Sequence, residues 1–255
     1  MELNYYKQYY EMERQHWWFI AREKIICEHI AKIKREQLTG KALRILNIGC
    51  GTGRSTEYLM QFGEVTSLEY DQFCCEYTRE RTGLDIINGS ITELPFADNS
   101  YDLVVAYDVI EHVEDDNLAM REMKRVCVEG GVVMVTVPAF MSLWGQHDVI
   151  NHHFRRYQIG RINELFNTQG ATGKLVFSSY FNTYLFLPIL AVRKLTNLWH
   201  KISPPKEKKS DFDSVQTGMV NSLLESMMHS ENKRMLKGKS WPFGVSILGY
   251  WHKKV

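Results

Sequence analysis

The chain has 255 residues, of which 31 are basic and 30 acidic, so its formal charge at neutral pH is +1. This balance argues against a dedicated nucleic-acid-binding protein, and a hydrophobic content of 44% argues against global disorder. The length fits one large domain, or one domain with an elaborated cap.

The first segment, residues 1–40, has a helical pattern rich in tyrosine and tryptophan. It contains the cluster His16-Trp17-Trp18-Phe19, followed by Arg22. We predict that this segment is a lid, in which the aromatic rings cover a bound ligand and Arg22 meets an anion. The alternative is a helix that packs its apolar stripe on the core.

Between residues 41 and 137, short apolar runs alternate with helical patterns. This alternation predicts right-handed crossovers and a parallel sheet covered by helices on both faces. A turn is expected at residues 129–131, where the sequence reads Glu-Gly-Gly. The expected strands are residues 44–48, 65–68, 85–87, 103–106 and 132–137, and the expected helices are residues 54–62, 72–81 and 117–126.

After Pro138 the sequence becomes aromatic and rich in histidine. We expect a Rossmann-like core over residues 41–180, a helical cap or insert over residues 181–240, and a last core strand within residues 241–255. Inside the insert, residues 203–214 are rich in proline and charge and indicate a linker. The smaller elements expected are a helix at 159–168, a strand at 174–178, a helix at 219–235 and a strand at 244–254.

Three glycines, Gly49, Gly51 and Gly53, follow the first expected strand and precede a helix. A strand, a glycine turn and a helix start form a cradle for a nucleotide. Glu69 stands 20 residues after Gly49, where a carboxylate can accept both hydroxyls of a ribose. The loop lacks the third glycine spacing of a dinucleotide site and the Lys-Ser/Thr of a phosphate loop. The pattern therefore favours a nucleoside that carries no phosphate.

These motifs resemble those of class I S-adenosylmethionine-dependent methyltransferases. The resemblance lies in "ILNIGCGTG" (residues 45–53), "VTSLEYD" (65–71), "GSITELPFADNSYDLVVAYDVIEHV" (89–113) and "EGGVVMVTVP" (129–138). It implies an α/β, Rossmann-like fold with a seven-stranded, mostly parallel sheet and a final antiparallel strand. It also implies S-adenosyl-L-methionine as cofactor and S-adenosyl-L-homocysteine as product. The flanking segments resemble bacterial small-molecule methyltransferases of type 11 more loosely and identify no substrate.

The resemblance also implies the cofactor site. Asn47 stands where the family usually has an acid, and Ser90 stands where an Asp commonly faces the adenine. Asn47 can still organise the loop, and Ile91 can pack on the base. The expected cofactor-binding residues are Asn47, Gly49, Cys50, Gly51, Gly53, Glu69, Tyr70, Ser90, Ile91, Tyr107, Asp108, Arg22 and Trp18.

The stretch "HDVINHHFRRY" (residues 147–157) follows the fifth expected strand and should face the methyl donor. A histidine there can remove a proton from a hydroxyl or amine, which makes His147, His152 and His153 the candidate catalytic bases. Glu111 and His112 follow the fourth strand at the same edge of the sheet. The expected substrate-binding residues are His112, Trp144, Arg155, Arg156 and Tyr157.

Two other interpretations of this histidine-rich stretch stay open. A divalent ion on the histidines and Asp148 is one, but no second carboxylate is spaced to complete it, so we expect no metal site. A surface loop whose histidines cap helices is the other.

The sequence thus predicts in-line methyl transfer to an O or N atom of a small metabolite, with no nucleic-acid partner. Five cysteines without a CxxC pair and a start without an apolar core indicate a cytoplasmic protein. One alternative is a lipid-linked or quinone-like acceptor, with peripheral membrane contact through residues 184–209. The same apolar insert suits a homodimer contact. An alternative of another class is a non-catalytic S-adenosylmethionine-binding regulatory or partner protein.

Overall fold

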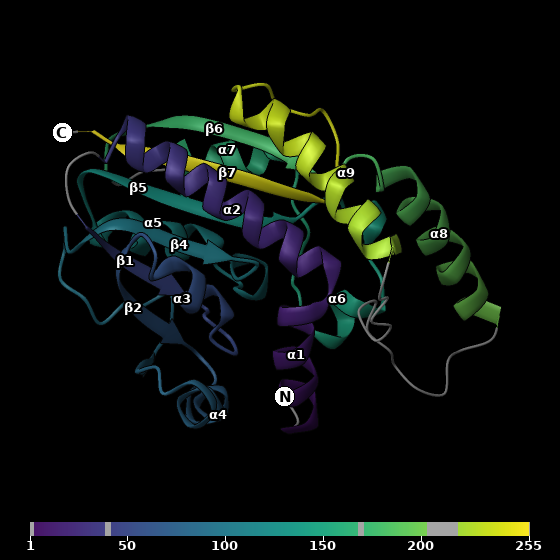
Figure 1. Cartoon of the computed structure of the whole chain (residues 1–255), viewed down its shortest axis with the longest axis horizontal. Coiled ribbons are helices and arrows are strands. Elements are labelled where there is room, and N and C mark those ends of the chain that lie inside the picture. The colour runs from purple at the N-terminus through teal and green to yellow at the C-terminus, as the bar shows by residue number, and fades with distance from the viewer. Residues whose placement is uncertain (1–2, 39–41, 168–170, 203–218, 255) are drawn as a thin grey trace.

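The computed structural model describes residues 3–38, 42–167, 171–202 and 219–254. Its strands form one seven-stranded sheet in the order β3-β2-β1-β4-β5-β7-β6 (Figure 1). The pairs from β3 to β5 are parallel, whereas β7 runs antiparallel to β5 and β6. This confirms the predicted sheet, including its antiparallel last strand. The strands are β1 (Leu43–Ile48), β2 (Gly63–Glu69), β3 (Ile86–Asn88), β4 (Tyr101–Tyr107), β5 (Cys127–Pro138), β6 (Gly173–Phe181) and β7 (Ser246–Lys253).

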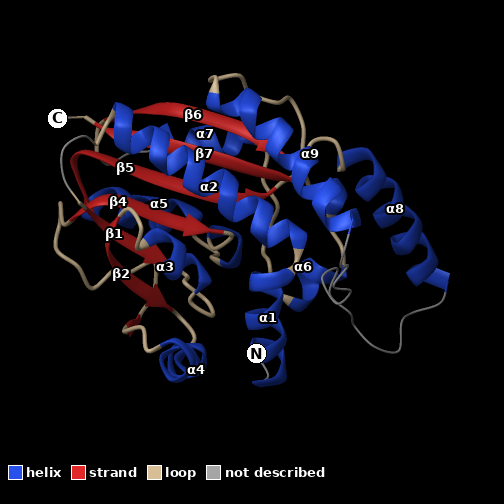
Figure 2. Ribbon diagram, in the orientation of Figure 1, coloured by secondary structure: helices blue, strands red, loops and turns tan. Residues whose placement is uncertain are grey.

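Helices cover both faces of the sheet (Figure 2). Successive side chains of β4 point to opposite faces, so that Leu103 packs in one core and Val104 in the other. The first core contains α2 (Trp17–Glu36), α3 (Arg54–Leu59) and α9 (Met219–Leu236), and the second contains α5 (Asp116–Val126) and α7 (Ile159–Asn167). The other helices are α1 (Leu3–Gln15), α4 (Gln72–Thr82), α6 (Gln146–Ile150), α8 (Phe186–Ile202) and the short 3-10 helices η1 (Ile110–His112) and η2 (Met141–Leu143).

The N-terminal segment is two helices with a break at His16. His16 has an extended backbone (φ −79°, ψ 131°), and its Nδ1 accepts a hydrogen bond from the Trp18 backbone N–H at 3.2 Å. This side chain therefore caps the start of α2, directly after the last residue of α1. That the segment acts as a lid stays a prediction.

The turn predicted at residues 129–131 lies inside β5. The pairing with β4 jumps from Tyr101–Cys127 to Leu103–Val132, and Gly130 has a φ of +73°. The strand therefore begins earlier than expected, and the glycines form an irregularity within it. The linker predicted at residues 203–214 falls outside the described residues.

No helix among the described residues is long and apolar enough to cross a bilayer.

A buried polar contact joins α2 to α9. Asn232 is fully buried; its Oδ1 accepts from His29 Nε2 at 3.0 Å, and its Nδ2 donates to Glu28 Oε2 at 2.6 Å. Asn232→Ala leaves the buried His29 nitrogen without this partner, so we expect a loss of about 1–3 kcal/mol in unfolding free energy. Urea denaturation measures it, with the exposed neighbour Lys233→Ala as control. Equal effects of the two substitutions would contradict this account.

Candidate functional site

The glycine loop leaves β1 and enters α3 at the carboxyl edge of the sheet. Gly49, Gly51 and Gly53 have φ values of +68°, +53° and +88°, which other residues rarely adopt. A Cβ on Gly49 would lie 2.4 Å from Val109 Cγ2, whereas a Cβ on Gly51 would meet nothing within 4 Å. The loop therefore packs tightly against the chain after β4 and leaves open space beside Gly51.

The Glu69 carboxylate lies across this space at the end of β2. It accepts hydrogen bonds from the backbone N–H groups of Gly51 (3.0 Å), Tyr70 (2.9 Å) and Asp71 (3.1 Å). Burial raises the pKa of Glu69, although these hydrogen bonds oppose the shift. A fixed carboxylate beside bare main chain fits the ribose of a nucleoside, so these residues suit the predicted cofactor.

Other predicted cofactor residues support this loop or lie outside it. Asn47 is buried, and its Nδ2 donates to Ser55 Oγ at 2.8 Å and to Thr56 Oγ1 at 3.0 Å. It therefore anchors the first turn of α3. Cys50 and Ile91 are buried, and the Ser90 hydroxyl bonds Thr92 Oγ1 at 2.7 Å.

Two tyrosines lie differently from the expectation. The Tyr70 ring is exposed, so only its backbone takes part in the Glu69 hydrogen bonds. The Tyr107 hydroxyl lies 3.7 Å from Met134 Sδ in the core under α2 and α3. The Tyr107 side chain is therefore part of this core.

The two N-terminal helices contact the same edge of the sheet. Glu13 on α1 accepts a hydrogen bond from the Thr52 hydroxyl in the glycine loop. Arg22 on α2 pairs with Asp108, and its guanidinium lies 4.7 Å from the centre of a Trp18 ring. The Arg22 charge predicted to meet an anion is thus compensated by Asp108, a residue at the end of β4 with a φ of +55°.

A cavity of about 310 Å³ lies beside this edge. Aromatic side chains of α1 and α2, including Trp18, form one wall. Asp108 is also part of the wall, and the next residue, Val109, packs against Gly49 of the glycine loop. Ile189 and Arg193 of α8 form another part of the wall. The remaining predicted site residues at the wall are His112, His147, His153 and Arg156.

A buried carboxylate organises the histidine-rich side of the cavity. Asp148 on α6 is fully buried; it accepts from His153 Nδ1 at 2.9 Å, from Arg156 Nε at 2.7 Å and from the Gly145 N–H at 2.8 Å. Arg193 Nη1 lies 3.3 Å from its second oxygen. Burial alone would raise the pKa of Asp148, but His153 and Arg156 hold it well below its usual range.

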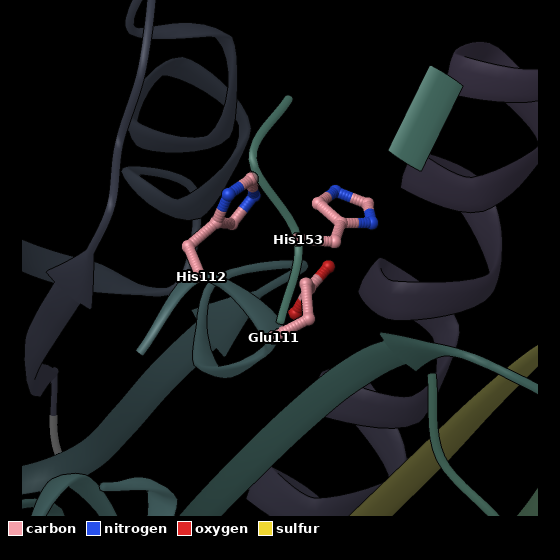
Figure 3. A group of neighbouring side chains, drawn as sticks. All are labelled: Glu111, His112 and His153. Carbon is pink, nitrogen blue, oxygen red and sulfur yellow. The ribbon is translucent and has the colours of Figure 1, made fainter. Parts of the chain in front are cut away.

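Glu111, His112 and His153 meet at the cavity wall (Figure 3). One nitrogen of each histidine and one Glu111 oxygen all lie within 4.8 Å of one another. Glu111 is fully buried, and neither of its carboxylate oxygens has a hydrogen-bond partner within the part of the chain that the structure describes. Burial and the nearby Asp108 carboxylate raise the pKa of Glu111 well above its usual value.

The three histidines predicted as catalytic bases lie in different surroundings. His153 belongs to the group with Glu111, whereas His152 is exposed and absent from the cavity wall. His147 lies at the wall near Asn151, and burial lowers the pKa of His147 to about 3.

The predicted substrate arginines do not form an anion clamp. Arg155 turns toward the start of α5, where it pairs with Asp116 at 3.2 Å, while Arg156 pairs with Asp148.

Tyr157 is buried, and its hydroxyl donates to the Ile110 carbonyl at 3.1 Å. Trp144 lies outside the cavity wall, and its carbonyl accepts from Asn197 Nδ2 at 2.9 Å. Because these groups are engaged elsewhere, only Arg156 and His112 of the predicted substrate residues reach the cavity.

The comparison with known families decides the identity of the core. Residues 46–135 match the family described as "Methyltransferase domain". The chain contains a class I S-adenosylmethionine-dependent methyltransferase domain. The matched residues include the glycine loop, Glu69, Asp108, Glu111 and His112, and S-adenosylmethionine is the cofactor of this family.

Relatives of the methyltransferase domain extend over part of the chain. A protein of Mycolicibacterium smegmatis named "Probable S-adenosylmethionine-dependent methyltransferase" is 29% identical over 163 residues, 62% of this chain and 61% of its own length. A demethylmenaquinone methyltransferase of Staphylococcus aureus is 30% identical over 127 residues, 44% of this chain. The chain thus spans about three fifths of the first relative and, at 53%, about half of the second.

The fold of the methyltransferase domain also matches solved structures. A TehB-like, S-adenosylmethionine-dependent methyltransferase of Corynebacterium glutamicum superposes with a TM-score of 0.51. The match covers 92% of this chain and 88% of that one at 14% identity, so it shows the fold alone.

The open space beside Gly51 gives a matched test of the cofactor site. Gly51→Ala and Gly83→Ala both place a Cβ at positive φ in open space, so each should cost about 1–2 kcal/mol of stability. Only Gly51 faces Glu69, so we expect Gly51→Ala alone to weaken S-adenosylhomocysteine binding, by at least tenfold. Isothermal titration calorimetry measures this, and equal affinities of the two variants would contradict the assignment.

Glu13 makes the docking of α1 sensitive to pH. Burial raises the pKa of Glu13 from 4.5 to about 7. The folded state therefore keeps a proton that the unfolded chain releases, and stability falls as pH rises through this window, by up to about 1.4 kcal/mol per pH unit. We expect Glu13→Gln to remove this decline in chemical denaturation between pH 4.5 and pH 7. Parallel pH profiles of the variant and the parent would refute it.

Proposed function

We propose that the protein transfers the methyl group of S-adenosylmethionine to an O or N atom of an acceptor in the 310 Å³ cavity. This proposal rests on Asp108 and Val109, two adjacent residues that link the cofactor loop to the cavity. Val109 packs against Gly49 of the cofactor loop, and Asp108 belongs to the cavity wall. A cofactor on Gly51 and Glu69 would then lie next to the acceptor.

When bound, the cofactor supplies a methyl group already activated by its sulfonium. The residues of the chain then have to position the acceptor in line with that methyl group and exclude water. Positioning of this kind contributes about 7–11 kcal/mol in favourable systems. Trp17, Trp18 and Phe19 at the cavity wall suit the exclusion of water.

Among the three predicted histidines, we propose that His153 assists the removal of a proton from the acceptor. Its side chain lies at the cavity wall, and Asp148 fixes its Nδ1, which directs Nε2 away from Asp148. His152 is exposed and outside the wall. His147 has a pKa lowered to about 3 and therefore holds a proton poorly near neutral pH.

The second candidate acceptor is lipid-linked or quinone-like, and α8 favours it. The inner side of α8 carries Ile189 and Arg193 at the cavity wall. Its outer side carries Leu187, Leu195 and Trp199, which are 65%, 68% and 64% exposed. An apolar outer face on a helix that contains no acidic residue suits the surface of an anionic membrane. The quinone substrate in the name of the staphylococcal relative is compatible with this alternative.

A single-turnover assay with methyl-labelled S-adenosylmethionine tests the function. We expect label to move into a small-molecule extract, or into a lipid extract if the alternative holds, and His153→Ala to slow transfer by about 10²- to 10⁴-fold. His152→Ala is the matched control and should retain the parent rate. Binding of S-adenosylhomocysteine without label transfer to either extract would indicate the non-catalytic binding protein instead. Equal rates for the two histidine variants would remove His153 from the mechanism.

A further inference from the structure

We propose that Glu111, His112 and His153 bind a divalent metal ion at the wall of the acceptor cavity. These residues come from two segments, η1 after β4 and the chain after α6. A backbone hydrogen bond from the Phe154 N–H to the Glu111 carbonyl, at 2.8 Å, ties the two segments together. The three ligand atoms within 4.8 Å of one another are thus held by the fold (Figure 3).

The Glu111 carboxylate supplies the first independent indication of a cation. Its side chain has no exposed surface, and both of its oxygens lack a hydrogen-bond partner among the described residues. An ionised carboxylate that is buried without a partner costs several kcal/mol of desolvation, and a bound cation would offset this cost. The two cations whose charge reaches Glu111 are Arg156 and Arg22. Arg156 is already paired with Asp148 and Arg22 with Asp108, so neither supplies that charge in full.

The hydrogen bonds around the two histidines supply the second indication. Histidines that bind metals usually donate their other ring nitrogen to a carboxylate or a backbone carbonyl. His153 uses Nδ1 for Asp148, which leaves Nε2 for an ion. His112 has a hydrogen bond with the backbone of Asn151. The two rings are 4.5 Å apart between centroids and nearly perpendicular, at 88°, so they are not stacked on each other.

The ligand set indicates the class of ion. Two imidazoles and one carboxylate suit a first-row divalent cation such as Mn²⁺ or Zn²⁺ better than Ca²⁺ or Mg²⁺, which prefer oxygen ligands. Three protein ligands leave coordination positions open. His112 and His153 both belong to the cavity wall, so the open positions would face the acceptor.

The role of this ion rests on the proposed methyl transfer. A cation next to an acceptor hydroxyl lowers the pKa of that hydroxyl. The O–H proton then passes to solvent, the oxygen forms the new O–CH₃ bond, the S–CH₃ bond breaks, and the sulfonium becomes a neutral thioether. The contribution of His153 to deprotonation would then be to hold the cation.

Titration of the chelator-treated protein with MnCl₂ and, separately, with ZnCl₂ tests the site. Electron paramagnetic resonance of free Mn²⁺ and calorimetry with Zn²⁺ measure the binding. We expect one ion per chain, with affinity lowered at least tenfold in Glu111→Gln and in His112→Ala. His152→Ala is the control and should bind like the parent. Glu111→Gln keeps the size of the buried side chain, and His112 is exposed, so at least one variant should fold as judged by circular dichroism.

Absence of binding of both ions, or affinity unchanged in both ligand variants, would overturn the metal site. The transfer assay, repeated with and without chelator, keeps this outcome separate from the proposed function. Methyl transfer that is insensitive to chelator, in a protein that binds neither ion, would remove the metal site and leave the function standing. Binding of one ion without methyl transfer to any extract would retain the site and remove the function.

Discussion

The buried charge of Asp148 is the interaction on which the acceptor side of the molecule depends. A carboxylate with no exposed surface is stable here because Gly145, His153, Arg156 and Arg193 all converge on it. These partners are the N-cap residue of α6, two residues of the chain after α6 and one residue of α8. One buried charge therefore fixes the His153 ring, closes the loop after β5 and places α8 at the cavity.

The cofactor side is built on a different constraint, which is the geometry of parallel strands. β1, β2 and β4 end at one edge of the sheet, so Gly49, Glu69 and Asp108 lie close together although they are far apart in sequence. The N-terminal helices then join the two sides, because Glu13 contacts the glycine loop and Arg22 contacts Asp108. A movement of α1 and α2 would thus shift the contacts of the cofactor loop and of the cavity wall at the same time.

The fold could be predicted from the sequence because buried apolar runs and glycine turns are local signals. The apolar run before Gly49 is a strand at the expected position, and the family resemblance supplied the antiparallel β7. The site was harder to predict, since it depends on side-chain direction. Arg155 and Arg156 are adjacent and face different carboxylates, and Tyr107 points into the core. The sequence predicted α8 as part of a helical cap but did not place it, so it could not show that Arg193 reaches the cavity wall. The pair Glu111-His112 could be identified from the sequence, but its contact with His153 could not.

The central claim is that S-adenosylmethionine binds with its adenosine at Gly51 and Glu69. Its sulfur then faces the group formed by Glu111, His112 and His153. A crystal structure of the protein with S-adenosylhomocysteine tests it most directly. The account predicts the ribose hydroxyls on the Glu69 carboxylate and the sulfur facing the cavity wall beside Asp108. A ligand bound elsewhere, or one whose sulfur points away from the cavity, would contradict the account.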